Sequence, residues 1–179
     1  MKLIKYLFFV GIISFAYACS SSSGDDDESG SGLERIPSGE IVAKELRNET
    51  LTGFSSLSGK SSSKMGDTQK WWTHVTSDFS FNDNDVCDED DESYNSQGYA
   101  ALYPNGKRYQ KTSKDGSPFE VGTWQWTDSN KTALHIDNET DIVFKITYLN
   151  NGNLVFGYTA SQGGCTLTTY EEFNAPFFE

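Results

Sequence analysis

The chain has 179 residues, of which 14 are Lys or Arg and 26 are Asp or Glu, so its formal net charge at pH 7 is -12. Proteins that bind nucleic acid gather Lys and Arg against the phosphate backbone. This acidic composition therefore excludes nucleic acid as a partner, and the length suits a single domain behind an export segment.

Residues 1–18 have the composition of a secretory signal peptide. Lys2 and Lys5 flank the start, the apolar run "LFFVGIISFA" follows, and the small residues Ala16 and Ala18 come next. The run is shorter than the roughly 20 apolar residues that cross a bilayer. We therefore expect export and cleavage rather than a permanent membrane span.

A lone cysteine, Cys19, stands immediately after the predicted cleavage point. A cysteine in this position resembles the lipobox of bacterial lipoproteins, in which the new N-terminal cysteine is acylated and anchors the protein to a membrane. The segment 19–38 opens with "CSSSSGDDDESGSG", which has little apolar area to bury, so it predicts a flexible tether. Ordinary secretion after Ala18 is the alternative.

Four consecutive acidic residues, 25–28, follow the cysteine within this tether. The block resembles the acidic signal of surface-exposed lipoproteins of Bacteroidota. That resemblance implies an outer-membrane location with the folded domain facing the cell exterior. A self-repelling linker on a protein that faces the periplasm is the alternative.

Two further cysteines, Cys87 and Cys165, lie in the part of the chain that is expected to be exported. Disulfides persist in exported proteins, so we expect these two residues to form a bridge. Two buried free thiols are the alternative, because free cysteine is among the most buried residue types. Two thiols are too few for a structural zinc site.

Residues 39–70 combine a short predicted helix with irregular chain. In the stretch "GEIVAKELR" (39–47), Ile41, Val42 and Leu46 fall on one face of a helix, and Ser38 is placed to cap it. The chain that follows is rich in Ser and Gly and shows neither the helical nor the strand period.

From residue 71 onward, aromatic and β-branched residues come in short runs separated by turn residues. Asn105-Gly106 marks one turn clearly, because an Asn-Gly pair tolerates the positive φ angles of a tight hairpin. Alternation also indicates strands, since Phe144 and Ile146 fall on one face and Lys145 on the other. The predicted strands cover residues 71–81, 96–103, 107–113, 119–127, 132–137, 141–149, 153–159 and 165–170.

About eight strands thus follow one another with short connections and no helices between them, which indicates an antiparallel meander. A meander removes its exposed edges by closing on itself. Residues 71–179 are therefore predicted to form an all-β, up-and-down barrel, with room for a core or for one small ligand. A β-sandwich of two sheets is the alternative.

The segments "YPNGKRY", "GTWQWTDSNKTALHI" and "FKITYLNNGNLVF" resemble, in this order, the lipocalin-like domains of Bacteroidota lipoproteins. The resemblance covers roughly residues 50–170. Its most specific parts are Gly122-x-Trp124 and the Leu134-x-Ile136 pattern that follows. It implies a barrel fold, and because it includes no active-site motif it implies no particular activity.

An acidic run, "NDNDVCDEDDE", holds the candidate calcium ligands Asp83, Asp85, Asp88 and Asp90. Calcium takes six to eight oxygen ligands, which a flexible loop can supply. The EF-hand spacing is missing, however, because Cys87 stands where an oxygen ligand belongs. A solvated acidic loop between strands is the alternative, and no other cofactor is expected.

Four tryptophans, Trp71, Trp72, Trp124 and Trp126, are candidate ligand-binding residues, because aromatic faces stack on sugars or line apolar pockets. Core packing is the alternative. Trp71 and Trp72 are adjacent and point to opposite faces of a strand. One of the two should therefore be exposed or cover an end of the barrel.

Signatures of catalysis are missing from the sequence. The two histidines, His74 and His135, lie in predicted strands, and there is neither a Gly-x-Ser-x-Gly elbow nor a His-x-x-x-His pair. We therefore expect a non-enzymatic lipoprotein, attached to the membrane by its anchor, that binds a small apolar molecule or a glycan. A filled barrel that serves another envelope protein as an accessory subunit is the first alternative, and a glycoside or ester hydrolase is the second.

Overall fold

A computed structural model of the protein describes residues 35–55, 68–82, 87, 90–95, 98–137 and 141–179. The predicted signal peptide (1–18) and Cys19 lie outside these described residues. No helix within the described ranges is long and apolar enough to span a membrane. In chain order the elements are η2 (Lys44–Leu46), α1 (Arg47–Thr52), β1 (Lys70–Phe81), β2 (Glu92–Tyr94), β3 (Tyr99–Leu102), β4 (Lys107–Lys111), β5 (Phe119–Trp126), β6 (Ala133–Ile136), β7 (Phe144–Leu149), β8 (Asn153–Gln162) and β9 (Cys165–Phe178).

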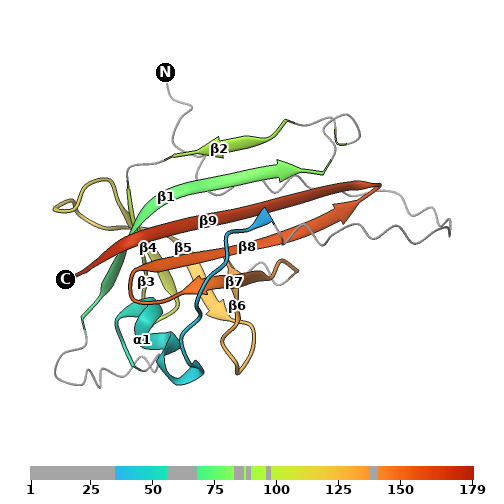
Figure 1. Cartoon of the computed structure of the whole chain (residues 1–179). Coiled ribbons are helices and arrows are strands. Elements are labelled where there is room, and N and C mark those ends of the chain that lie inside the picture. Colours follow the sequence, from blue (N-terminus) through green and yellow to red (C-terminus); the bar gives the residue numbers. More distant parts are fainter. Residues whose placement is uncertain (1–34, 56–67, 83–86, 88–89, 96–97, 138–140) are drawn as a thin grey trace.

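Eight of these strands form a closed antiparallel barrel (Figure 1). Strands β1 and β3 to β9 pair in chain order, and β9 returns to pair with β1 over residues 70–81. The extra strand, β2, pairs with the far end of β1, whereas β3 pairs with its beginning. The barrel confirms the predicted up-and-down architecture, which is compatible with a lipocalin-like fold, and the sandwich alternative is wrong.

Strand β9 is longer than the sequence indicates. The prediction ends this strand at residue 170, but β9 continues to Phe178. The extension contains Pro176, which has no N–H to donate to the ladder. The pairing with β1 shifts register between Trp71 and Thr73, and this bulge accommodates the proline.

The helix predicted at 39–47 is misplaced, because η2 and α1 occupy residues 44–52 and residues 36–43 form an extended strap. Strand β6 pairs with β7 only at Phe144 and Lys145, which leaves the rest of that β7 edge open. The strap covers this edge, where Gly39 N–H donates to the carbonyl oxygen of Thr147 and Leu149 N–H donates to that of Glu40. These backbone bonds hold the strap extended, and Ser38 caps no helix.

The strap begins within the segment predicted as a tether (19–38). Ile36 is 3% exposed, and it lies over Gly157, where a Cβ atom would come within 2.9 Å of Ile36 Cδ1. The carbonyl oxygen of Pro37 accepts a hydrogen bond of 2.7 Å from Thr147 Oγ1. The packed domain therefore includes these last residues of the predicted tether.

The interior of the barrel is filled at the end that α1 covers (Figure 1). Leu51 of α1 is fully buried and plugs this end. It packs with large side chains from the strands, namely Trp72, Leu102, Trp124, Leu134, Ile136, Ile146, Leu149, Leu154, Phe156 and Phe173. These residues give the core that the alternating pattern predicts, and they occupy the interior at this end.

A disulfide joins Cys87 to Cys165, the pair that the sequence analysis proposes. Their Cα atoms are 5.0 Å apart, although 78 residues separate them along the chain. The bridge ties the loop after β1 to the first residue of β9. Closing a loop of this length stabilises the fold by about 4 to 5 kcal/mol in the chain-entropy model.

Candidate functional site

Side chains at the beginning of β1 cap the carboxyl end of α1. The last carbonyl groups of a helix have no partners within the helix, and side-chain donors commonly satisfy them. The hydrogen bonds run from Lys70 Nζ to Thr50 O (2.8 Å), from Trp72 Nε1 to Leu51 O (2.9 Å) and from Gln69 Nε2 to Thr52 O (3.2 Å). The segment "QKWW" thus fixes a six-residue helix to the end of the barrel.

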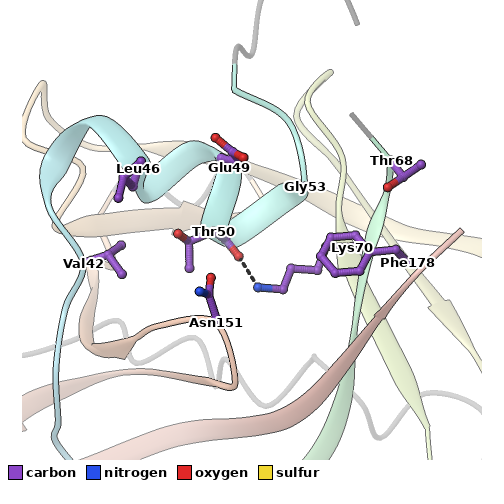
Figure 2. Close-up of a pocket in the computed structure, with 9 residues that line it drawn as sticks. All are labelled: Val42, Leu46, Glu49, Thr50, Gly53, Thr68, Lys70, Asn151 and Phe178. Atoms are coloured by element: carbon purple, nitrogen blue, oxygen red, sulfur yellow. Dashed lines mark hydrogen bonds between the residues drawn. The ribbon is translucent and has the colours of Figure 1, made fainter. Parts of the chain in front are cut away.

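A cavity of about 500 Å³ lies beside this capped helix (Figure 2). Its walls come from the strap, from α1, from the beginning of β1, from the turn between β7 and β8 and from the end of β9. Cavities of this size hold small molecules. Segments from distant parts of the sequence therefore meet at one place that can receive a ligand.

Lys70 is the residue of this wall whose surroundings are least ordinary for its type. It is only 2% exposed, and its Nζ atom lies 4.1 Å from the centre of the Trp72 ring and 5.9 Å from that of Phe178. Among the described residues, no carboxylate oxygen lies within 4.0 Å of this atom. Burial lowers the pKa of Lys70 from 10.5 to about 8. A carbonyl oxygen and aromatic ring faces are its observed neighbours in place of an anion.

The other cavity residues are a mixture of polar and apolar side chains. Glu49 contributes a carboxylate and Asn151 an amide, and Val42 and Leu46 form an apolar wall. Phe178, which is 57% exposed, presents its ring at the edge of the cavity. Sugars offer hydroxyl groups to polar side chains and C–H faces to aromatic rings, so this lining suits a glycan better than a wholly apolar molecule.

Neither Trp71 nor Trp72 is exposed, so of the two expected possibilities, exposure or a place over an end of the barrel, exposure is excluded. Their exposed fractions are 1% and 0%, respectively. Trp72 belongs to the core, while Trp71, on the opposite face, is covered by Lys111 and Tyr103. Lys111 Nζ lies 4.4 Å from the Trp71 ring centre, and the Tyr103 ring packs edge-on at 6.2 Å. The contact of the Lys111 ammonium group with the ring is a cation–π interaction.

Trp124 and Trp126 also fill the barrel. Their rings meet edge-on at 5.6 Å, and Trp124 is 3% exposed. Trp124 Nε1 donates to the carbonyl oxygen of Tyr103, and Trp126 Nε1 donates to Asn48 Oδ1. Of the four candidate tryptophans, Trp72 contacts the cavity residue Lys70, whose ammonium group lies over the Trp72 ring.

A second buried cation, Arg108 of β4, is paired within the barrel. Its Nη2 atom lies 2.8 Å from Asp137 Oδ2, and Asp137 Oδ1 accepts a hydrogen bond of 2.9 Å from the Thr123 N–H. A Cβ atom at Gly122 would collide with Asp137 Oδ1. The glycine of the Gly122-x-Trp124 pattern therefore makes room for this ion pair.

Glu171 of β9 completes what we call the Arg108 cluster, which consists of Arg108, Asp137 and Glu171. Glu171 lies two residues from the core residue Phe173 and so points to the same interior face. Burial raises the pKa of Glu171 from 4.5 to about 7, Arg108 opposes this shift, and Asp137 adds to it. Because carboxyl groups of the protein already neutralise Arg108, we assign this cluster to packing.

The calcium prediction falls mostly outside the described residues. Asp83, Asp85 and Asp88 are not described, and Asp90 is exposed. Within the described part of the chain, no three His, Cys, Asp or Glu side chains gather closely enough to hold a metal ion. Calcium binding by this loop stays a prediction.

Both histidines are engaged with neighbours in the barrel. His74 Nε2 lies 3.0 Å from Ser77 Oγ, and its ring packs edge-on against Phe173 at 5.1 Å. His135 Nδ1 lies 3.1 Å from the carbonyl oxygen of Ile142. Neither histidine lines the cavity.

The sequence analysis does not single out Lys70, Glu49, Asn151 or Phe178 as a site. The sequence does contain one indication of this site, because Lys70 directly precedes two tryptophans at the start of a predicted strand. A charged residue at such a position usually marks the solvated beginning of a strand. Only the folded chain shows that α1 covers it.

No protein-family model, curated protein or solved structure matches this chain. The assignment of the fold therefore rests on the geometry of the closed barrel.

Proposed function

We propose that the chain is a lipid-anchored lipoprotein of the outer membrane, of the kind found in Bacteroidota, whose barrel binds a glycan at the cell surface without catalysing a reaction. The position of Cys19 and the acidic block at 25–28 support the anchor and the outward orientation. Protease treatment of intact cells, with Cys19→Ala as the comparison, tests that location.

One observation carries the binding function: a cavity with mixed polar and apolar walls lies beside α1, while the adjoining barrel interior is filled. The ligand site of this proposal is thus at the closed end of the barrel rather than in its lumen. The exposed ring of Phe178 supplies a stacking surface, and Asn151 and Glu49 supply hydrogen-bonding groups.

The proposal is for binding rather than hydrolysis because of the carboxyl groups around the cavity. A glycosidase generally places two carboxyl groups on either side of the scissile bond. Among the described residues that line the cavity, Glu49 is the single carboxylate. The second carboxyl group that such a mechanism requires is not part of this wall.

Tryptophan fluorescence provides the test, because Trp72 is fully buried beneath the Lys70 ammonium and should respond to a ligand in the cavity. Oligosaccharides should produce a saturable change in the wild-type protein. Phe178→Ala should weaken binding about tenfold or more, as expected when a stacked aromatic ring is removed. Phe119→Ala is the matched control, since Phe119 is 47% exposed and does not line the cavity.

The second candidate is an accessory subunit of an envelope complex, and the filled core favours it. A barrel without a lumen can work through its outer surface alone. In that case, no oligosaccharide produces a saturable fluorescence change in the wild-type protein, and Phe178→Ala behaves like Phe119→Ala.

A further inference from the structure

We propose that the cavity selects an acidic glycan, a sugar chain that bears carboxylate groups, and that Lys70 is the residue that recognises the carboxylate. This inference rests on the proposed function and narrows its ligand class. It follows from the placement of one cation, from the direction of its ammonium group and from the charges around it.

The positive charge of Lys70 is not balanced by a nearby carboxylate among the described residues of the cavity wall. Lys70 is 2% exposed, and its Nζ atom has one observed hydrogen bond, to the carbonyl oxygen of Thr50. An ammonium group has three N–H donors. A buried charge costs free energy unless an opposite charge compensates it. A carboxylate placed in the cavity would provide the opposite charge that the described residues do not place within 4.0 Å.

The Lys70 side chain also has a favourable direction. Figure 2 shows the Lys70 side chain extending along the cavity, with its ammonium group between Thr50 and Asn151. The Asn151 amide can donate a hydrogen bond to the same carboxylate that the ammonium group binds. The cavity therefore offers two donors on one side and, at Phe178, an aromatic face for the sugar ring.

Glu49 is the negative charge that also lines the cavity. Figure 2 shows its carboxylate pointing away from the Lys70 ammonium group. It therefore does not neutralise Lys70, although it repels an incoming anion. Removal of this charge should strengthen the binding of an acidic glycan, whereas it should do little to a neutral one.

Binding of a carboxylate in the cavity is linked to the protonation of Lys70. Because burial lowers the pKa of Lys70 to about 8, part of the protein carries a neutral amine at mildly alkaline pH. Binding of a carboxylate favours the ammonium form, so the complex takes up a proton in this range. Affinity should be constant below about pH 7 and fall by up to tenfold per pH unit above about pH 8.

Calorimetric titration of the exported chain tests the inference. The two probes are oligomers of galacturonic acid and the same oligomers as methyl esters, in which a methyl group replaces the negative charge of each carboxylate. We expect the acidic oligomer to bind at least tenfold more tightly, and Lys70→Met to abolish this preference. Glu49→Gln should raise the affinity for the acidic oligomer about twofold to fivefold. Lys107→Met is the charge-matched control, because Lys107 does not line the cavity.

Two readouts separate recognition from the helix-capping role of Lys70. Proton uptake, measured at pH 8 in two buffers of different ionisation enthalpy, should accompany binding of the acidic oligomer alone. The pH profile of the wild-type protein should show the loss of affinity above pH 8 without any substitution. Both measurements remain informative even where Lys70→Met alters the end of the barrel.

The outcomes distinguish the two proposals. Equal binding of the acidic and neutral oligomers, or a preference that Lys70→Met leaves unchanged, overturns this inference and leaves the glycan-binding function standing. If neither oligomer binds and a wider set of oligosaccharides also fails, the proposed function is overturned and this inference falls with it.

Discussion

Lys70 and Arg108 are both buried cations, but the protein surrounds them differently. Arg108 lies within the barrel with Asp137 2.8 Å away and Glu171 nearby. Lys70 lies at the closed end against a carbonyl oxygen and two aromatic rings, and it borders a cavity. A buried charge that the protein neutralises by itself contributes to packing, whereas one that faces a cavity without a nearby carboxylate is available to a ligand.

Removal of the buried Arg108 charge should change the stability of the protein most. Arg108→Met leaves Asp137 and Glu171 without their cation, and should lower the free energy of unfolding by about 3 kcal/mol. The value allows for the 30% exposure of the Asp137 side chain. Urea unfolding at pH 7 measures the effect.

Lys107→Met provides the control for this measurement. Lys107 and Glu120 form an ion pair in which both side chains are 44% exposed, so its loss should change stability by less than about 1 kcal/mol. Equal effects of Arg108→Met and Lys107→Met would show that the Arg108 cluster has no special weight in the fold.

Removal of the Lys70 charge should change the free energy of unfolding in the opposite direction, towards greater stability. Lys70→Met removes a cation that burial penalises, so it should raise the free energy of unfolding at pH 7 by about 2 to 3 kcal/mol, less whatever the lost capping bond contributed. The pKa of Lys70 is about 8 in the folded state and 10.5 as a reference value. Between these values the unfolded chain binds more protons, so wild-type stability rises with pH.

The measurement is a series of urea unfolding curves between pH 7 and pH 10.5 for both proteins. The advantage of Lys70→Met should shrink across this range as Lys70 becomes neutral in the wild type. A destabilised variant with a constant deficit at every pH would mean that the hydrogen bond to Thr50 outweighs the burial of the charge.

A weaker effect is expected at Glu171. Burial raises the pKa of this residue to about 7. Glu171→Gln should stabilise the protein at pH 8 by about 1 kcal/mol, a value reduced for the solvent that this half-buried side chain retains. Between pH 7 and pH 4.5, Glu171 is protonated in the folded protein but not in the unfolded chain. The free energy of unfolding of the wild type therefore rises as the pH falls, and it approaches that of the variant. Thermal unfolding at pH 8 and pH 4.5 should show a difference in Tm only at the higher pH.

The barrel could be predicted from the sequence because its information is local. Turn residues such as Asn105-Gly106 and strict alternation in segments such as β7 indicate each strand separately, and the lack of intervening helices then leaves closure as the simplest arrangement. The prediction is wrong where distant segments decide the local structure. The strap is extended because β7 has an open edge, and β9 continues past Pro176 because β9 itself bulges there against β1.

The cavity could not be predicted for the same reason. Leu46, Lys70, Asn151 and Phe178 are far apart in the sequence, and no single motif links them. The sequence suggests the four tryptophans as candidates because their aromatic faces are large, but the same large apolar area favours their burial in the core. What identifies the site is the absence of a nearby carboxylate from the described surroundings of Lys70, which only the folded structure reveals.

The cap on α1 has a consequence for the order in which the protein folds. A helix of six residues does not persist alone in water. Its carbonyl groups depend on Gln69, Lys70 and Trp72, which are held in place by the ladder between β1 and β9. The ladder between β1 and β9 must therefore form before the helix settles. The cavity therefore takes shape only after β1 and β9 have paired, because Lys70 and Phe178 in its wall come from these two strands.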